Sequence, residues 1–124
     1  MAQRTILIAD DDLLVRTLLK DALAPGGYQV IEAKDGREAV RKFKADRPDL
    51  VMIDLMMPNQ SGIEALSEIR AFDPKSRILV VSSLEAEGLM SSALESGAMG
   101  YVVKPFHPME ISDAVKRALE QSHA

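Results

Sequence analysis

The chain has 124 residues, the size of one compact domain that can bury an apolar core without disulfides or a structural metal. It contains no cysteine, which excludes thiolate metal sites and cysteine nucleophiles, and its formal net charge of -4 disfavours direct binding to nucleic acid. The first apolar run, Ile6 to Ala9, is too short for a membrane span or a signal peptide. We therefore expect one domain over residues 1–124 that is soluble, cytoplasmic and free of membrane contact.

Short apolar runs typical of strands alternate with helical patterns along the chain. The strands are predicted at Thr5–Ala9, Tyr28–Ala33, Leu50–Ile53, Ile78–Ser82 and Tyr101–Val103. They are rich in Val and Ile and mostly apolar on both faces, as in strands that helices cover on both sides. This alternation predicts an α/β fold, a doubly wound parallel five-stranded sheet with helices on both faces.

The first helix is predicted from a periodic apolar pattern after the first strand. Its stripe consists of Val15, Leu18, Leu19 and Ala22. We therefore expect Arg16 and Lys20 to face away from the core.

The other helices have recognisable ends. Asp35 followed by Glu38 resembles a capping box that opens the second helix, and Pro74 closes off the third. Gly97 stands where the fourth helix needs a left-handed cap, and Pro108 opens the fifth. The fourth helical segment, residues 85–96, is a weak helix with a glycine and three serines, compatible either with a movable surface or with an ordinary solvated helix.

Polar residues stand where four of the five strands end. Asp10, Asp11 and Asp12 follow the first strand, Asp54 follows the third, Ser82 ends the fourth and Lys104 follows the fifth. The carboxyl ends of parallel strands share one edge of the sheet, so these side chains should converge in one crevice. Two unit charges about 4 Å apart repel by roughly 4 kcal/mol at an effective dielectric constant near 20, so the acids need a compensating cation. Oxygen ligands in an open site favour Mg²⁺.

Each of these residues also has an ordinary structural explanation. Asp11 or Asp12 can simply cap the first helix, and Asp54 can start a turn. Lys104 can lie over apolar strand ends, and Ser82 can be a plain strand residue. The Lys104-Pro105 pair favours a functional site, because proline forces a turn that directs the ammonium group back to the strand ends.

Four segments resemble one known family, the CheY-like receivers of two-component signalling. They are Ile6 to Asp12, Pro48 to Pro58 with Ser61-Gly62, Val80 to Ser83, and Gly97 to Phe106. The resemblance covers the whole chain and implies a flavodoxin-like (βα)5 fold with strand order 2-1-3-4-5. It also implies a cis peptide bond between Lys104 and Pro105.

The resemblance assigns roles to the residues at the strand ends. Asp54 would be the phosphorylated carboxylate, Lys104 would pair with the phosphoryl group, and Ser82 would hydrogen-bond one of its oxygens. Asp11 and Asp54 would bind Mg²⁺ directly, with Asp10 acting mainly through water. The backbone carbonyl of Met56 would be a further metal ligand. Ser82 would shift on activation, and Tyr101 would be the aromatic switch that turns inward behind it.

The same resemblance implies a function and its partners. A histidine kinase or a histidine phosphotransfer protein would phosphorylate Asp54, and a downstream protein would bind the surface of the fourth helix, fifth strand and fifth helix. We expect a stand-alone receiver without enzymatic turnover, either monomeric or weakly dimeric when phosphorylated. Met56 and Leu84 lie where the family tunes access of the attacking water, and their apolar side chains predict slow loss of the phosphoryl group.

Two alternatives remain open. The chain can be the receiver part of a larger DNA-binding regulator or hybrid kinase. It can also be a phosphohydrolase that works through an aspartyl phosphate, as haloacid dehalogenase-like enzymes do, with Asp10 as nucleophile and Asp12 as the second acid. The small size of the chain disfavours this second alternative, because such enzymes need a cap or a larger core.

Overall fold

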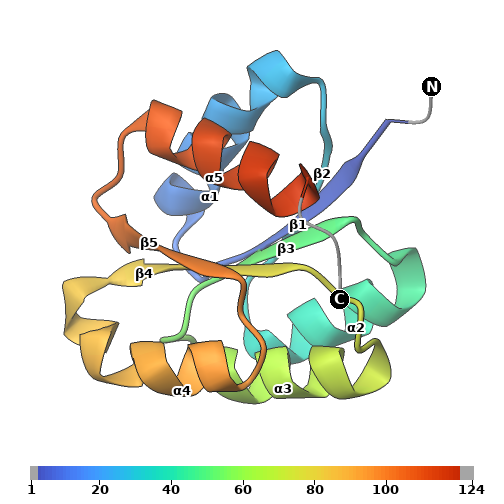
Figure 1. Ribbon diagram of the computed structural model, residues 1–124, viewed down its shortest axis with the longest axis vertical. Coiled ribbons are helices and arrows are strands. Elements are labelled where there is room, and N and C mark those ends of the chain that lie inside the picture. Colours follow the sequence, from blue (N-terminus) through green and yellow to red (C-terminus); the bar gives the residue numbers. More distant parts are fainter. Residues whose placement is uncertain (1–2, 121–124) are drawn as a thin grey trace.

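The computed structural model describes residues 3–120, without the side chains of residues 84, 85 and 87. Its five parallel strands form one sheet in the order β2-β1-β3-β4-β5, which confirms the predicted fold class (Figure 1). The strands are β1 Thr5–Ala9, β2 Gln29–Ala33, β3 Leu50–Ile53, β4 Ile78–Ser83 and β5 Gly100–Lys104. All five strands were predicted, and no end differs by more than one residue.

Helices cover both faces of the sheet in three layers. They are α1 Leu13–Leu23, α2 Gly36–Asp46, α3 Gly62–Phe72, α4 Met90–Glu95 and α5 Pro108–Glu120, with short 3-10 helices η1 Ala24–Gly26 and η2 Leu84–Leu89. In Figure 1, α1 and α5 lie above the sheet, and α2, α3 and α4 lie below it. No helix among residues 3–120 is long and apolar enough to cross a membrane.

Each face of the sheet has its own apolar core. The core on the α2–α4 side includes Phe43 and Leu66, and the core on the α1 and α5 side includes Leu19 and Ile111. Alternate residues of a strand point to opposite faces, so β3, which is apolar throughout, and β1, which is apolar from Ile6 to Ala9, supply both cores. Only the ends of these strands are free to carry polar residues.

The predicted helix ends are confirmed. The Asp35 carboxylate accepts a hydrogen bond of 2.8 Å from the Glu38 N–H at the start of α2. Gly97 follows α4 with a φ of 115°, a conformation that glycine adopts without a steric penalty. The weak fourth segment folds as η2 followed by the short helix α4.

The predicted apolar stripe of α1 is wrong at one position. Leu18 is 46% exposed, whereas Leu19 and Leu23 are 1% exposed and face the sheet. Arg16, expected to face solvent, has a side chain that is only 13% exposed, because it turns toward Glu32 on β2. The helix is therefore rotated relative to the prediction.

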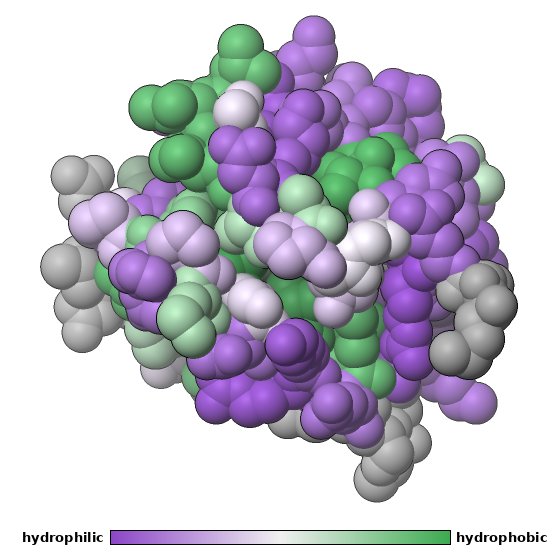
Figure 2. Space-filling model, turned by 90° about the horizontal axis from the view of Figure 1, so that it is seen from above, coloured by the Kyte–Doolittle hydropathy of each residue, from purple (hydrophilic) through white to green (hydrophobic). Residues whose placement is uncertain are grey.

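This rotation leaves apolar side chains on the outside. Figure 2 looks onto the layer of α1 and α5 and shows a largely polar surface with one group of apolar side chains at the upper left and further apolar areas right of centre. The most exposed apolar residues of the two helices are Leu13, Leu14, Leu18 and Met109. The apolar residues of α1 are thus divided between core and surface.

Candidate functional site

The predicted site residues meet at the carboxyl edge of the sheet. Asp10 follows β1, Asp54 follows β3, Ser82 lies near the end of β4, and Lys104 ends β5. These residues are far apart in sequence, and the parallel pairing of β1, β3, β4 and β5 brings them together. These side chains therefore converge at one edge of the sheet, as predicted.

Asp54 is held by donors on both carboxylate oxygens. It is only 7% exposed. Its Oδ1 accepts hydrogen bonds from the Ser82 hydroxyl at 2.6 Å and from the Met56 N–H at 3.1 Å, and its Oδ2 lies 3.0 Å from Lys104 Nζ. These donors hold the carboxylate in a fixed orientation, which a nucleophile needs.

Lys104 bridges two buried acids. Its Nζ lies 2.6 Å from Asp10 Oδ2, in addition to its contact with Asp54, and the Asp10 residue is 1% exposed. Burial raises the pKa of Asp10 and the charge of Asp54 adds to this rise, although hydrogen bonds from Lys104 and the Asp12 N–H oppose it. Burial also acts to lower the pKa of Lys104, but its hydrogen bonds to Asp10 and Asp54 outweigh it and place this pKa above the usual value. Lys104 therefore remains a cation at neutral pH.

Three carboxylates can face one cation. Asp10, Asp11 and Asp54 each offer an oxygen atom, and these atoms lie within 4.8 Å of one another. Asp11 is exposed, so the cluster is open to solvent on one side. Hard oxygen donors beside an open side fit a cation such as Mg²⁺ that retains part of its water shell. The Met56 carbonyl, which the resemblance adds to these donors, stays a prediction.

Asp12 does not belong to this cluster. Its side chain accepts a hydrogen bond of 2.9 Å from the Leu14 N–H and caps the start of α1. For Asp12 the ordinary explanation, a helix cap, therefore describes what the side chain does.

Ser82 and Tyr101 lie on the neighbouring strands β4 and β5. Ser82 is 0% exposed. Tyr101 is half-buried, packs against the core on the α2–α4 side, and places its hydroxyl 3.4 Å from the Ser83 carbonyl oxygen. Their proximity is compatible with the predicted switch, and the movement itself stays a prediction. The expected cis peptide bond between Lys104 and Pro105 is confirmed.

The residues predicted to control water access are only partly described. Met56 is 51% exposed and follows Asp54 closely in the chain. The side chain of Leu84 lies outside the described part of the structure. The prediction of a shielded phosphoryl group stays a prediction.

The sequence patterns missed Arg16. Its Nη1 donates a hydrogen bond of 2.7 Å to the main-chain oxygen of Asp10, and its Nε donates one of 2.9 Å to Glu32 Oε1. Helical periodicity placed Arg16 on the solvent side, and no other pattern in the sequence linked it to the acids.

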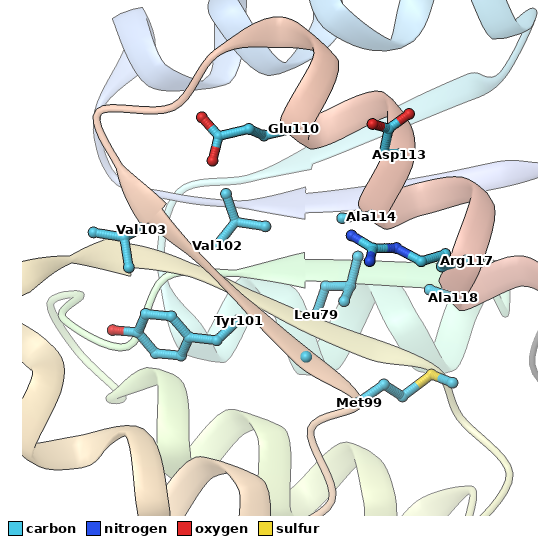
Figure 3. A pocket seen from close by; sticks show the side chains of 11 residues that line it. Leu79, Met99, Tyr101, Val102, Val103, Glu110, Asp113, Ala114, Arg117 and Ala118 are labelled. Carbon is cyan, nitrogen blue, oxygen red and sulfur yellow. The ribbon is translucent and has the colours of Figure 1, made fainter.

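A separate hollow lies beside β5 and α5 (Figure 3). It has a volume of about 540 Å³, and Tyr101 and Val103 line it from the strand while Glu110, Asp113 and Arg117 line it from the helix. None of the acids near Asp54 lines this hollow. It lies instead on the face predicted to bind a downstream protein.

Comparisons with known proteins agree with these observations. Residues 6–116 match the family model of the response regulator receiver domain. The chemotaxis protein CheY of Thermotoga maritima is 39% identical over 115 residues, which cover 92% of this chain and 96% of that protein. The alkaline phosphatase synthesis transcriptional regulatory protein PhoP of Bacillus subtilis is 38% identical over 96% of this chain and 50% of its own length. The crystal structure of the CheX-CheY-BeF3-Mg+2 complex from Borrelia burgdorferi covers 95% of this chain and 90% of its own, with a TM-score of 0.89 and 32% identity.

Proposed function

The chain belongs to the response regulator receiver family of two-component signalling, and on that premise we propose that Asp54 is its phosphoryl acceptor. One observation carries this proposal: Asp54 is buried, bonded to Ser82 and Lys104, and close to two further acids. Its donors are oriented toward the carboxylate before any phosphoryl group arrives. Preorganised donors of this kind stabilise the charge of phosphoryl transfer.

The proposed reaction moves one phosphoryl group from a phosphohistidine to Asp54. An oxygen of the carboxylate attacks phosphorus, a new O–P bond forms, the N–P bond breaks, and imidazole leaves. The donor is a histidine kinase or a histidine phosphotransfer protein. In the product, Lys104 and Ser82 hydrogen-bond the phosphoryl oxygens.

Mg²⁺ is the proposed cofactor, and when bound it neutralises part of the negative charge of the phosphoryl group and the acids. Asp11 and Asp54 would hold it directly, Asp10 would hold it through water, and the Met56 carbonyl would be a further ligand. The cluster of carboxylate oxygens supports this assignment. The CheX-CheY-BeF3-Mg+2 complex from Borrelia burgdorferi, a related receiver structure, supports it too.

The proposed output is a change in the surface formed by α4, β5 and α5. Ser82 moves toward the phosphoryl group, Tyr101 turns inward behind it, and a downstream protein binds the altered surface. The related CheY that is in complex with CheX supports a protein partner. We propose that the domain acts in the cytoplasm without direct contact to nucleic acid, as a monomer or as a weak dimer after phosphorylation.

The test is phosphorylation by acetyl phosphate in the presence of Mg²⁺. Intact-protein mass spectrometry should detect one phosphoryl group per wild-type chain and none in Asp54→Asn. Asp12→Asn is the matched control, since Asp12 lies outside the carboxylate cluster and asparagine also caps helices. It should retain the adduct, and an adduct that persists in Asp54→Asn would refute the proposal.

Two alternatives lead to different outcomes of the same assay. Sustained hydrolysis of acetyl phosphate by Asp54→Asn would indicate a phosphohydrolase. Receiver domains as a family are generally not enzymes that act on an external substrate. The transcriptional regulator PhoP, which is about twice as long as the matched region, is a precedent for a receiver within a larger protein, whereas CheY of Thermotoga maritima, matched over 96% of its length, supports a stand-alone domain. The position of the stop codon in the native gene separates that alternative from a stand-alone domain of residues 1–124.

A further inference from the structure

Arg16 connects three elements at the back of the carboxylate cluster. It lies on α1, its Nε donates to Glu32 Oε1 on β2 at 2.9 Å, and its Nη1 donates to the main-chain oxygen of Asp10 after β1 at 2.7 Å. The side chain is 13% exposed. A planar guanidinium group with several fixed donors suits such a double contact.

The oxygen that Arg16 holds belongs to the peptide bond between Asp10 and Asp11. On the other side of Asp10, its N–H donates to the Ala33 carbonyl oxygen at 3.0 Å, at the end of β2. The peptide unit is planar, so fixing its oxygen also fixes the directions in which the chain leaves Asp10 and enters Asp11. The contact with Arg16 therefore helps to set the backbone from which both carboxylates extend, while Lys104 and the Asp12 N–H hold the Asp10 carboxylate itself.

We infer that Arg16 is a positioning residue for the cation site and holds the Asp10–Asp11 peptide so that both carboxylates face one cation. This inference rests on the proposed function, because it concerns the same Mg²⁺ site. Within residues 3–120, the hydrogen bonds of the Arg16 side chain go to the main-chain oxygen of Asp10 and to the carboxylate of Glu32. Arg16 acts on the cation through the peptide and not by direct contact.

A purely stabilising salt bridge would behave differently, and Lys20 provides the comparison. Lys20 pairs with the same carboxylate, at 3.1 Å from Glu32 Oε2, but its side chain is 42% exposed. The Lys42 ammonium group contacts the main-chain oxygen of Glu32 and not its carboxylate. Lys20→Met therefore removes one ion pair of Glu32 and leaves the Asp10 peptide untouched.

Charge alone predicts the opposite effect from positioning. Arg16 is a cation close to a site for a second cation, so its removal should tighten Mg²⁺ binding if only charge mattered. If Arg16 positions the acids, its removal should weaken binding. Loss of groups that orient metal ligands typically lowers metal affinity by about 10- to 100-fold.

The test is calorimetric titration of Mg²⁺ into the unphosphorylated wild type, Arg16→Met and Lys20→Met. Methionine keeps the length of the apolar stem but donates no hydrogen bond. We expect the Kd for Mg²⁺ to rise about tenfold in Arg16→Met and to stay within about twofold in Lys20→Met. An unchanged or lower Kd in folded Arg16→Met overturns the inference.

A second readout separates positioning from general damage to the fold. In phosphorylation by acetyl phosphate, Arg16→Met should need about tenfold more Mg²⁺ for half-maximal rate, with a maximal rate within about threefold of the wild type. A maximal rate that falls strongly while the half-maximal Mg²⁺ concentration stays constant would contradict the assigned role.

Arg16→Lys keeps the inference testable if Arg16→Met fails to fold. This variant keeps the positive charge but lacks the guanidinium group that contacts Glu32 and the Asp10 oxygen together, so the Kd should rise by roughly three- to tenfold. A Kd equal to that of Lys20→Met overturns the inference. A wild type that neither binds Mg²⁺ nor forms the Asp54 adduct refutes the proposed function itself. If the wild type does both, and Arg16→Met binds Mg²⁺ with the same Kd, only the role of Arg16 is refuted.

Discussion

Replacement of Lys104 by methionine should lower the free energy of unfolding by about 3 kcal/mol in the absence of Mg²⁺. Lys104 Nζ bridges Asp10 at 2.6 Å and Asp54 at 3.0 Å, and the side chains of these acids are only 2% and 9% exposed. Breaking a buried ion pair costs about 3 to 5 kcal/mol, because it leaves a charge without its partner. The lower end applies because the Lys104 side chain is 19% exposed.

This loss corresponds to a fall of about 12 °C in Tm. The unfolding entropy of roughly 2.1 cal/mol/K per residue amounts to about 0.26 kcal/mol/K for a chain of 124 residues. The assay is thermal and urea unfolding in a chelating buffer, followed by circular dichroism. Both methods should give the same difference in stability if unfolding is two-state.

Addition of Mg²⁺ should restore part of the stability of Lys104→Met. A ligand that binds only the folded state adds about 2.7 kcal/mol at a concentration of 100 times its Kd. The acids of the variant are no longer neutralised by Lys104, so at equal Mg²⁺ concentration the gain should exceed that of the wild type.

Lys20→Met is the control, because its pair with Glu32 is largely exposed and should contribute less than about 1 kcal/mol. The reasoning is refuted if Lys104→Met unfolds within about 1 kcal/mol of the wild type in chelating buffer, or if Mg²⁺ stabilises it less than the wild type.

Three further predictions address the packing, the phosphoryl lifetime and the pH dependence. A Cβ atom on Gly62 would lie 2.1 Å from the Asp54 carbonyl oxygen, so Gly62→Ala should cost about 2 kcal/mol in urea unfolding, whereas Gly88→Ala, with nothing within 4 Å, should stabilise slightly. The double variant Met56→Asn, Leu84→Glu should lose its phosphoryl group faster than the wild type, and equal lifetimes in a time course of intact mass would contradict the shielding role. Burial acts to raise the pKa of Glu32, but hydrogen bonds from Lys20 and Arg16 outweigh burial and lower this pKa below its usual value. The ionised carboxylate therefore stabilises the fold at pH values above its unfolded pKa of about 4.3, and this stability is lost as the pH falls through the lower folded pKa. The difference in unfolding free energy between wild type and Glu32→Gln should therefore shrink from pH 5.5 to pH 3. A difference that stays constant over this range would contradict the lowered pKa of Glu32.

The sheet and most of the site could be predicted from the sequence because both depend on short-range patterns. A buried parallel strand must be apolar on both faces, so Leu50–Ile53 stands out, and the first polar residue after it, Asp54, must lie at the sheet edge. The same logic located Asp10 and Lys104. The hydrogen bonds that orient Asp54 could not be predicted, because the distance between Ser82 and Asp54 depends on the pairing of β3 with β4 and on the twist of the sheet.

The face of α1 could not be predicted for a different physical reason. Periodicity assigns a helix face by hydrophobicity alone, and it placed Leu18 inside and Arg16 outside. In the structure, Arg16 lies inward because it donates hydrogen bonds to two acceptors, the Glu32 carboxylate and the Asp10 carbonyl oxygen. Helical periodicity does not connect Arg16 with either acceptor. Because Leu18 is exposed, the fold loses some apolar burial. In return, the main-chain oxygen of Asp10 beside the acids receives a hydrogen bond. Predictions from hydrophobic periodicity tend to fail at functional sites, where a residue is placed for its contacts and not for its hydrophobicity. The failure at Arg16 is the reason to test this residue in the Mg²⁺ titration.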